Sequence, residues 1–388
     1  MSDLLTKYDA WLTDGGPAAL VIREHLMPVE GRDCVIFPST FAAGDGFPGG
    51  YNIDGPSGGE NVCLIDSVGS QSNRVEPVFA QDRYRGLVPQ VSIKASEKKA
   101  NEETASEKKA NEKKASVEKA NEEIVVNLLD AGHRAGDAIV RCSSLATDIK
   151  EAFKNVLTGN AGPLAKIAPT SLVFGVWDSR DTQAKLPRVV ASTIRAFNVR
   201  VLTRGAVYVP PLDYSALEVF SEEDKAKAEG NKKSPLAQRG FVHNPASGSH
   251  GGVIATGGIR RDATLNLAAL RLLRAGREKD GKDNDPLPLR RYILGLSLVA
   301  FTHPSAFVGY LRQGCTLVLD PDAKPAPREF SLVHHDGKRD SLAVTHDDAL
   351  EFAKHAAEKF GVGKSKTATF EKEAAKQDVA ETKQGKKG

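Results

Sequence analysis

The chain has 388 residues, 40% of them hydrophobic and 27% charged, a composition that fits a globular protein with a large core. Its formal net charge is only +3, from 53 basic and 50 acidic residues, so a basic surface can arise only from local arrangement. The four cysteines show no short paired spacing, which argues against a zinc knuckle or a disulfide framework. A signal-peptide pattern and an apolar run long enough for a membrane are both missing, so we expect a cytoplasmic protein with no membrane partner.

Strands and helices alternate along the chain. Apolar runs rich in β-branched residues predict strands, among them residues 19–26, 62–66, 87–93, 171–177 and 315–320. Helical patterns cover Asp9–Leu12, Ile149–Leu157, Thr264–Ala275 and Asp347–Phe360, the last with Thr345 as its N-cap and Gly361 as its stop. Since a glycine fingerprint for dinucleotides is missing, we expect an α+β fold rather than a doubly wound sheet.

Three segments differ from the rest in composition. Residues 95–123 form a ten-residue repeat with seven Lys, eight Glu and one large apolar residue, and we expect a solvated helical or disordered insertion. Residues 215–249 are rich in charge, Gly and Pro, which predicts an exposed, mobile loop. Residues 362–388 are polar and Lys-rich and are expected to be a disordered tail.

Small polar side chains follow the strand that ends at Asp66. They could let a phosphate approach the backbone where a helix begins, or they could simply form an N-cap with polar neighbours. These residues are Ser67, Ser70, Gln71, Asn73 and Arg74.

A second group surrounds His133 and Arg134, which lie between two glycines and are flanked by Asp130 and Asp137. Two interpretations stay open: structural ion pairing of Arg134 with one aspartate, or contact of His133 or Arg134 with phosphate or sugar. A metal site is disfavoured because no second histidine is near in sequence.

A third group lies in residues 161–212, where seven basic residues face two acidic ones. Trp177 would end a strand whose one face offers a partly aromatic platform, and Ser179 and Lys185 lack the spacing of a catalytic pair. We expect Asp178 and Asp181 to orient neighbouring arginines. The alternatives are polyanion contact and structural salt bridging. The side chains proposed for contact are Lys166, Arg180, Gln183, Lys185, Arg188 and Arg204.

A fourth group, Arg260 and Arg261, follows two glycines and precedes a predicted helix, an arrangement that suits phosphate or a glycine hinge. None of the four groups assembles a catalytic set, a cofactor motif or a metal site. The sequence therefore favours a non-catalytic protein that holds single-stranded nucleic acid through its backbone.

The stretches "GPAALVIREHLMPVEGRDCVIFPSTFA" (16–42), "CLIDSVGSQSNRVEP" (63–77), "VNLLDAGHRAGDAIVR" (126–141) and "PLAKIAPTSLVFGVWDSRDTQAKLPRVVASTIRAF" (163–197) resemble the CRISPR-associated RAMP protein of type I-U (I-G) systems. That family forms the backbone of Cascade. The resemblance covers most of residues 16–209, continues more loosely through 251–273, and skips 95–123.

The resemblance implies a ferredoxin-like or RRM-like palm over residues 1–361, with insertions as thumb and fingers and residues 215–249 as one candidate. Copies would polymerise along a CRISPR guide RNA in antiviral defence, and base pairing with the target DNA strand would read sequence. Implied partners are further copies, the large subunit, an RNA-processing RAMP subunit and the helicase–nuclease. The stretch from Ser67 to Arg74 is similar to a guide-gripping segment of related subunits.

Two other functions stay open. Some RAMP proteins cleave RNA, and here His133, His243 and His250 would be the residues to test. The third possibility is a scaffold that binds only proteins.

Overall fold

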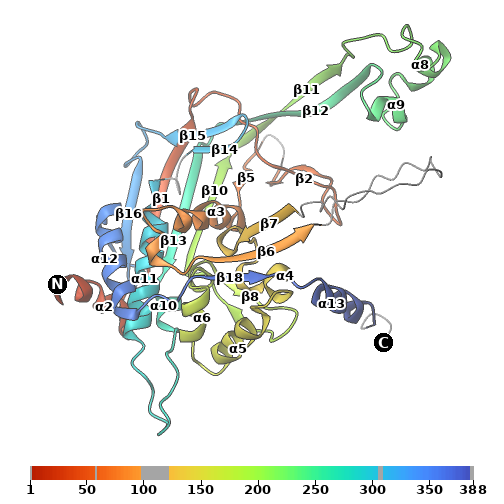
Figure 1. Ribbon diagram of the computed structural model, residues 1–388. Coiled ribbons are helices and arrows are strands. Elements are labelled where there is room, and N and C mark those ends of the chain that lie inside the picture. Colours follow the sequence, from red (N-terminus) through yellow and green to blue (C-terminus); the bar gives the residue numbers. More distant parts are fainter. Residues whose placement is uncertain (1, 57–58, 98–121, 305–308, 385–388) are drawn as a thin grey trace, which may run out of the picture.

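The computed structural model describes residues 2–56, 59–97, 122–304 and 309–384 (Figure 1). Its centre is a nine-stranded antiparallel sheet. Its strands follow the order β14 (Gly309–Arg312), β15 (Cys315–Leu319), β1 (Ala19–Pro28), β13 (Ile259–Asn266), β10 (Val190–Phe197), β5 (Val62–Asp66) and β4 (Ile53–Asp54), while β16 (Arg328–Val333) pairs with β1 and with β17 (Arg339–Ser341). Helices combined with an antiparallel sheet agree with the expected α+β class.

The central strands have one covered face and one open face. Along β1 and β13, buried side chains alternate with half-exposed ones. Leu20, Ile22 and Leu265 belong to the main core, whereas the side chains of Arg23 and Asp262 are 44% and 28% exposed. Because successive side chains of a strand point to opposite faces, this pattern separates a core face from a solvent face.

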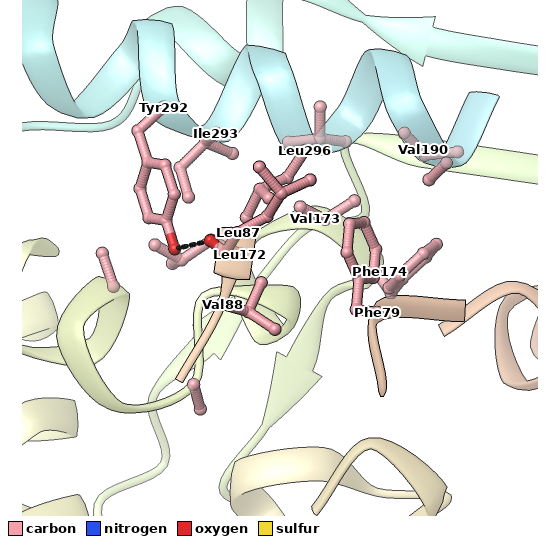
Figure 2. Packing of buried hydrophobic residues seen from close by; sticks show 14 of the residues in the cluster. Phe79, Leu87, Val88, Leu172, Val173, Phe174, Val190, Tyr292, Ile293 and Leu296 are labelled. Carbon is pink, nitrogen blue, oxygen red and sulfur yellow. Dashed lines mark hydrogen bonds between the residues drawn. The ribbon is translucent and has the colours of Figure 1, made fainter. Parts of the chain in front are cut away.

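Helix α11 (Leu287–Thr302) forms the middle of the core and is buried continuously from Tyr292 to Thr302. Figure 2 shows Tyr292 beside Leu87, whose carbonyl accepts a 2.8 Å hydrogen bond from the tyrosine hydroxyl. A helix that is apolar on all sides belongs inside a protein. Within the described ranges, no helix is long and apolar enough to cross a membrane.

Helix α12 (His346–Phe360) packs against α11 and confirms the helix expected over 347–360. Thr345 and Asp348 form a capping box at its start, and Gly361 ends it with φ = +74°. Two more expected helices are present, as α2 (Asp9–Leu12) and α5 (Ala146–Leu157).

The prediction of a strand at residues 171–177 is wrong. Residues Thr170–Phe174 form helix α7, all five of them buried, and Gly175 then takes φ = +79°. Only Val176–Trp177 is extended, as β8, and it pairs with β9 (Lys185–Leu186). The error has a physical cause: a short, fully buried apolar run has no periodicity that separates a strand from a helix.

The helix expected at 264–275 is also displaced. Strand β13 continues to Asn266, whose side chain accepts a 2.8 Å hydrogen bond from Ala269 N and so caps the short helix α10 (Leu267–Arg271). The arginines of "GGIRRD" consequently lie within a strand and not before a helix.

A long two-stranded arm leaves the sheet (Figure 1). It consists of β11 (Val199–Tyr208) and β12 (Asn244–Ala255), and its end carries α8 (Glu222–Ala228) and α9 (Pro235–Gln238). The segment expected to be a mobile loop thus contains two helices, which share a small core of Ala228, Ala237 and Val242.

The C-terminal segment is not disordered over residues 366–384, contrary to expectation. β18 (Lys366–Thr369) pairs in parallel with β6 (Val91–Glu97), Ala368 is buried, and α13 (Lys372–Gln384) follows. Backbone pairing orders this polar segment, and side-chain composition does not reveal such pairing. Of the repeat expected at 95–123, residues 98–121 lie outside the described residues, and its ends belong to β6 and β7 (Glu122–Asn127).

Other short elements complete the described fold: α1 (Ser2–Thr6), β2 (Thr40–Phe41), β3 (Gly50–Tyr51), α3 (Val68–Val75), η1 (Glu76–Ala80), η2 (Arg85–Leu87), η3 (Leu128–Asp130), η4 (Arg134–Gly136), α4 (Ala138–Arg141) and α6 (Gly162–Ile167).

Candidate nucleic-acid interface

A cavity of about 690 Å³ lies between two segments that are distant in sequence, residues 132–141 and 175–188. We call it the basic cleft. Its described lining contains five Arg or Lys side chains and no Asp or Glu. The lining residues are Gly132, His133, Arg134, Gly136, Ala138, Arg141, Gly175, Val176, Trp177, Ser179, Arg180, Lys185, Leu186 and Arg188.

The β8–β9 hairpin forms one wall of the basic cleft, and its turn is held by internal hydrogen bonds. Buried Asp178 accepts hydrogen bonds from Thr182 N (2.8 Å) and Thr182 Oγ1 (2.6 Å). Gln183 has φ = +61°, and its amide donates to Ser179 O. These bonds fix the positions from which Arg180 and Lys185 project.

The two aspartates of this turn do not orient arginines, so that expectation is wrong. Asp178 stabilises the turn itself, and Asp181 forms a 2.9 Å ion pair with Lys150 of helix α5. Both Arg180 and Lys185 are exposed, and within the described part of the chain neither has an acidic partner. Two positive charges therefore remain uncompensated at the mouth of the cleft.

Gly175 brings Arg188 close to the floor of the cleft. A Cβ at position 175 would lie 2.8 Å from Arg188 Cγ and 3.1 Å from Arg188 N, so a larger residue does not fit. The Arg188 Nε donates to Phe174 O at 3.1 Å, which holds the guanidinium near the end of α7. The requirement for glycine here is thus both steric and conformational.

Arg134 is largely committed to the protein. Its side chain is 5% exposed, with Nε 2.6 Å from Glu76 Oε2, and the guanidinium donates to Asn73 Oδ1 at 3.3 Å. Burial raises the pKa of Glu76 to about 7 against the opposing pull of Arg134, and burial lowers the pKa of Arg134. The structure therefore contains the ion pair that the sequence left open, with Glu76 as the partner instead of an aspartate.

His133 lies at the mouth of the basic cleft with its side chain 86% exposed. Its Nδ1 is 3.8 Å from Asp137 Oδ2, and Asp137 also accepts from Ile139 N as the N-cap of α4. Unlike Arg134, His133 is free to meet a ligand.

Of the five residues proposed on and before α3, only Asn73 reaches the basic cleft, through Arg134. Ser67 caps the helix by accepting from Ser70 N. Buried Gln71 accepts a hydrogen bond from Ser192 Oγ at 2.9 Å. Arg74 pairs with Asp66 at 3.2 Å and donates to Leu311 O. This stretch mostly joins α3 to the sheet.

Adjacent Arg260 and Arg261 point to opposite faces of β13. Arg261 is 1% exposed and pairs with Glu24 at 2.7 Å, and burial lowers its pKa. The prediction that Arg261 contacts a ligand is corrected: it is a structural residue. Arg260 lies on the open face, pairs with Asp262 at 2.9 Å, and its guanidinium lies 4.8 Å from the centre of the Phe197 ring.

Lys166 and Arg204 lie outside the lining of the basic cleft. Lys166 Nζ donates to Phe360 O at 2.7 Å and to Gly361 O, so it caps the C-terminal end of α12, and burial lowers its pKa. Arg204 is on the arm, 5.7 Å from the Phe37 ring centre. The cleft thus unites His133, Arg134, Arg180, Lys185 and Arg188, with Gln183 in the adjoining turn.

Sequence reasoning missed Arg141 and did not assign Trp177 to the site. Arg141 lines the basic cleft and pairs at 2.9 Å with Asp378 of α13. Its only sequence signal is its place at the end of the His133 segment. Trp177 lines the same cleft and is 56% exposed. The change from apolar to polar residues directly after Trp177 was the sequence signal that could have assigned it to the site.

No curated protein matches the chain. Residues 20–201, somewhat less than half of the chain, match the family model described as CRISPR-associated protein GSU0053. The matched residues include both walls of the basic cleft. The match supports a CRISPR-associated protein.

Proposed function

We propose that this chain is a non-catalytic CRISPR RNA-binding backbone subunit of a type I Cascade complex, which polymerises along the guide RNA. The proposal rests chiefly on the basic cleft. Two segments distant in sequence place five cationic side chains there, and the described lining residues include no Asp or Glu. Because the chain matches a CRISPR-associated family, we propose a guide RNA as the polyanion that binds in the cleft.

The basic cleft suits a nucleic-acid backbone. Arg180, Lys185 and Arg188 supply charge from exposed positions, and phosphates would complete the missing ion pairs. Such contacts position a strand without reading its sequence. Reading would then fall to pairing between the guide and the target DNA strand.

The rest of the fold is compatible with this role. A sheet covered by helices on one face is what a ferredoxin-like or RRM-like palm requires, and the β11–β12 arm would serve as a thumb or finger. Further copies of the chain and other Cascade subunits, including the helicase–nuclease, would be its partners.

Binding of fluorescently labelled single-stranded RNA, followed by anisotropy at several salt concentrations, tests the proposal. In the variant Arg180→Ala/Lys185→Ala, affinity should fall for every RNA sequence, and the slope of log K against log salt should shrink by about 0.7 per lost phosphate contact. The matched control Lys354→Ala/Lys359→Ala removes two exposed lysines of α12 and should bind like the wild type. Equal loss in both variants, or in neither, would contradict the assignment of the cleft.

RNA cleavage is the second candidate, because His133 lies beside Asp137 at the basic cleft and this pair could transfer a proton. His243 directly precedes strand β12 of the arm, and His250 lies within that strand. The ring of His250 contacts the ring of Tyr51 and not that of His133. Incubation with labelled repeat RNA, with and without Mg²⁺, decides between the two. Site-specific cleavage that His133→Ala abolishes would replace the non-catalytic proposal.

A further inference from the structure

Trp177 is a large aromatic side chain that the fold leaves in solvent. It is 56% exposed, although tryptophan is a residue type that folding usually buries to a large extent. A single exposed apolar side chain is common and means little by itself. Three further observations concern its position.

The first observation is that Trp177 lines the basic cleft, so its ring borders the cavity that contains the cationic groups. The second is that Lys185 is its direct partner across the β8–β9 hairpin. The Lys185 Nζ lies 5.4 Å from the centre of the Trp177 ring, within the range of a cation–π contact.

The third observation is that the backbone under Trp177 is fixed. The hairpin turn that follows is held by Asp178, and a Cβ at Gly136 would lie 3.0 Å from Trp177 O. The main chain of η4 at Gly136 thus packs closely against the main chain of Trp177. Because this backbone is already fixed in the free protein, a ligand that binds the ring has only the side-chain torsions of Trp177 to order.

We propose that Trp177 is a stacking platform for one nucleobase of the strand whose phosphates the basic cleft holds. This inference rests on the proposed function and adds a base-binding subsite to it. A base stacked on the indole brings the adjacent phosphates close to Lys185. This lysine would then contact both the aromatic ring and a phosphate. Any of the four bases can stack, since each has a π-face, so the subsite adds affinity without sequence preference.

The chain contains only two tryptophans, which makes the inference directly measurable. Trp11 is 9% exposed and packs against the Tyr8 ring, with a centroid distance of 4.4 Å, so a ligand does not reach it. A change in intrinsic fluorescence on adding a ligand therefore reports on Trp177, while Trp11 contributes a constant background. We expect a single-stranded RNA oligomer to quench it, and an abasic oligomer of the same length to bind with little quenching.

Anisotropy on the same samples separates binding from stacking. Trp177→Ala should weaken RNA binding at least about fivefold while leaving the abasic oligomer unaffected. Trp177→Phe keeps an aromatic ring, so it should recover part of the RNA affinity but lose the fluorescence change. Both replacements are on the surface, so unchanged circular dichroism should confirm that the variants fold.

The outcomes distinguish this inference from the proposed function. RNA binding that is insensitive to Trp177→Ala and leaves the fluorescence unchanged would overturn the stacking platform and leave the RNA-binding proposal intact. Equal weakening of RNA and abasic oligomer by Trp177→Ala would overturn it as well. A wild-type protein that binds no RNA would overturn both.

Discussion

Replacing Arg261 with methionine tests whether this arginine holds the sheet together or contacts a ligand. The change removes its ion pair with Glu24, whose carboxylate is fully buried, and its 2.8 Å hydrogen bond to Ser192 Oγ. Glu24 keeps one partner, Arg328, at 2.6 Å. We therefore expect a loss near the lower end of the range for a broken buried pair, about 3 kcal/mol in the free energy of unfolding.

Urea denaturation measures this loss. With an m value of about 3 kcal/mol/M, the midpoint should fall by about 1 M. Arg261→Met leaves the buried Glu24 carboxylate with only part of its compensating charge. Adding Glu24→Leu removes that carboxylate, so the double variant should regain part of the stability. RNA affinity of the folded Arg261→Met protein should equal that of the wild type.

Arg260→Ala is the matched control, because it removes the neighbouring arginine from the open face of the same strand. Its ion pair with Asp262 joins two partly exposed side chains, and we expect a loss below about 1 kcal/mol. An Arg261→Met protein as stable as this control, or one that keeps its stability but loses RNA affinity, would refute the structural role of Arg261.

Three further predictions concern the cleft, the response to acid and the C-terminal segment. Gly175→Ala should cost about 1–3 kcal/mol in urea denaturation and weaken RNA binding, because a Cβ meets Arg188 at a positive φ; wild-type values would contradict this. Burial lowers the pKa of His303 to about 4, and burial also lowers that of His346, whereas an unfolded histidine titrates near 6.5. The unfolded chain therefore takes up protons first, so these groups should lower the free energy of unfolding as the pH falls from about 6.5 to 4, and His303→Gln should reduce this decline. Removal of residues 362–388 deletes β18 and should lower the melting temperature, whereas a disordered tail would leave it unchanged.

The sequence predicted those elements whose signals are local. Helix α12 is framed by Thr345 and Gly361, both readable in the chain, and the apolar, β-branched run that predicted a strand at residues 19–26 lies in β1. Helix α7 was missed because a short run that is buried on all sides has no periodicity to separate a helix from a strand, and the β18 strand was missed because its order comes from backbone pairing with β6.

The site was predicted in parts and not as a whole. Charge and polarity led us to propose His133, Arg180, Lys185 and Arg188, and the structure places all four at the candidate site, but nothing in the sequence says that residues 132–141 and 175–188 share one cavity. The roles of Arg134 and Arg261 depended on Glu76 and Glu24, partners more than fifty residues away in the sequence, so local pattern could not separate these structural arginines from exposed ones.

The β6–β7 pairing has a consequence for how this chain accepts extra sequence. Glu97 and Glu122 are direct partners across the two strands, so the chain departs and returns at adjacent points. A segment inserted between such points leaves the strand register unchanged, and each doubling of its length costs only about 0.6 kcal/mol in loop-closure entropy. The hairpin end is therefore a natural acceptor site for foreign sequence, and a fluorescent domain or affinity tag placed there should leave the core and the basic cleft intact.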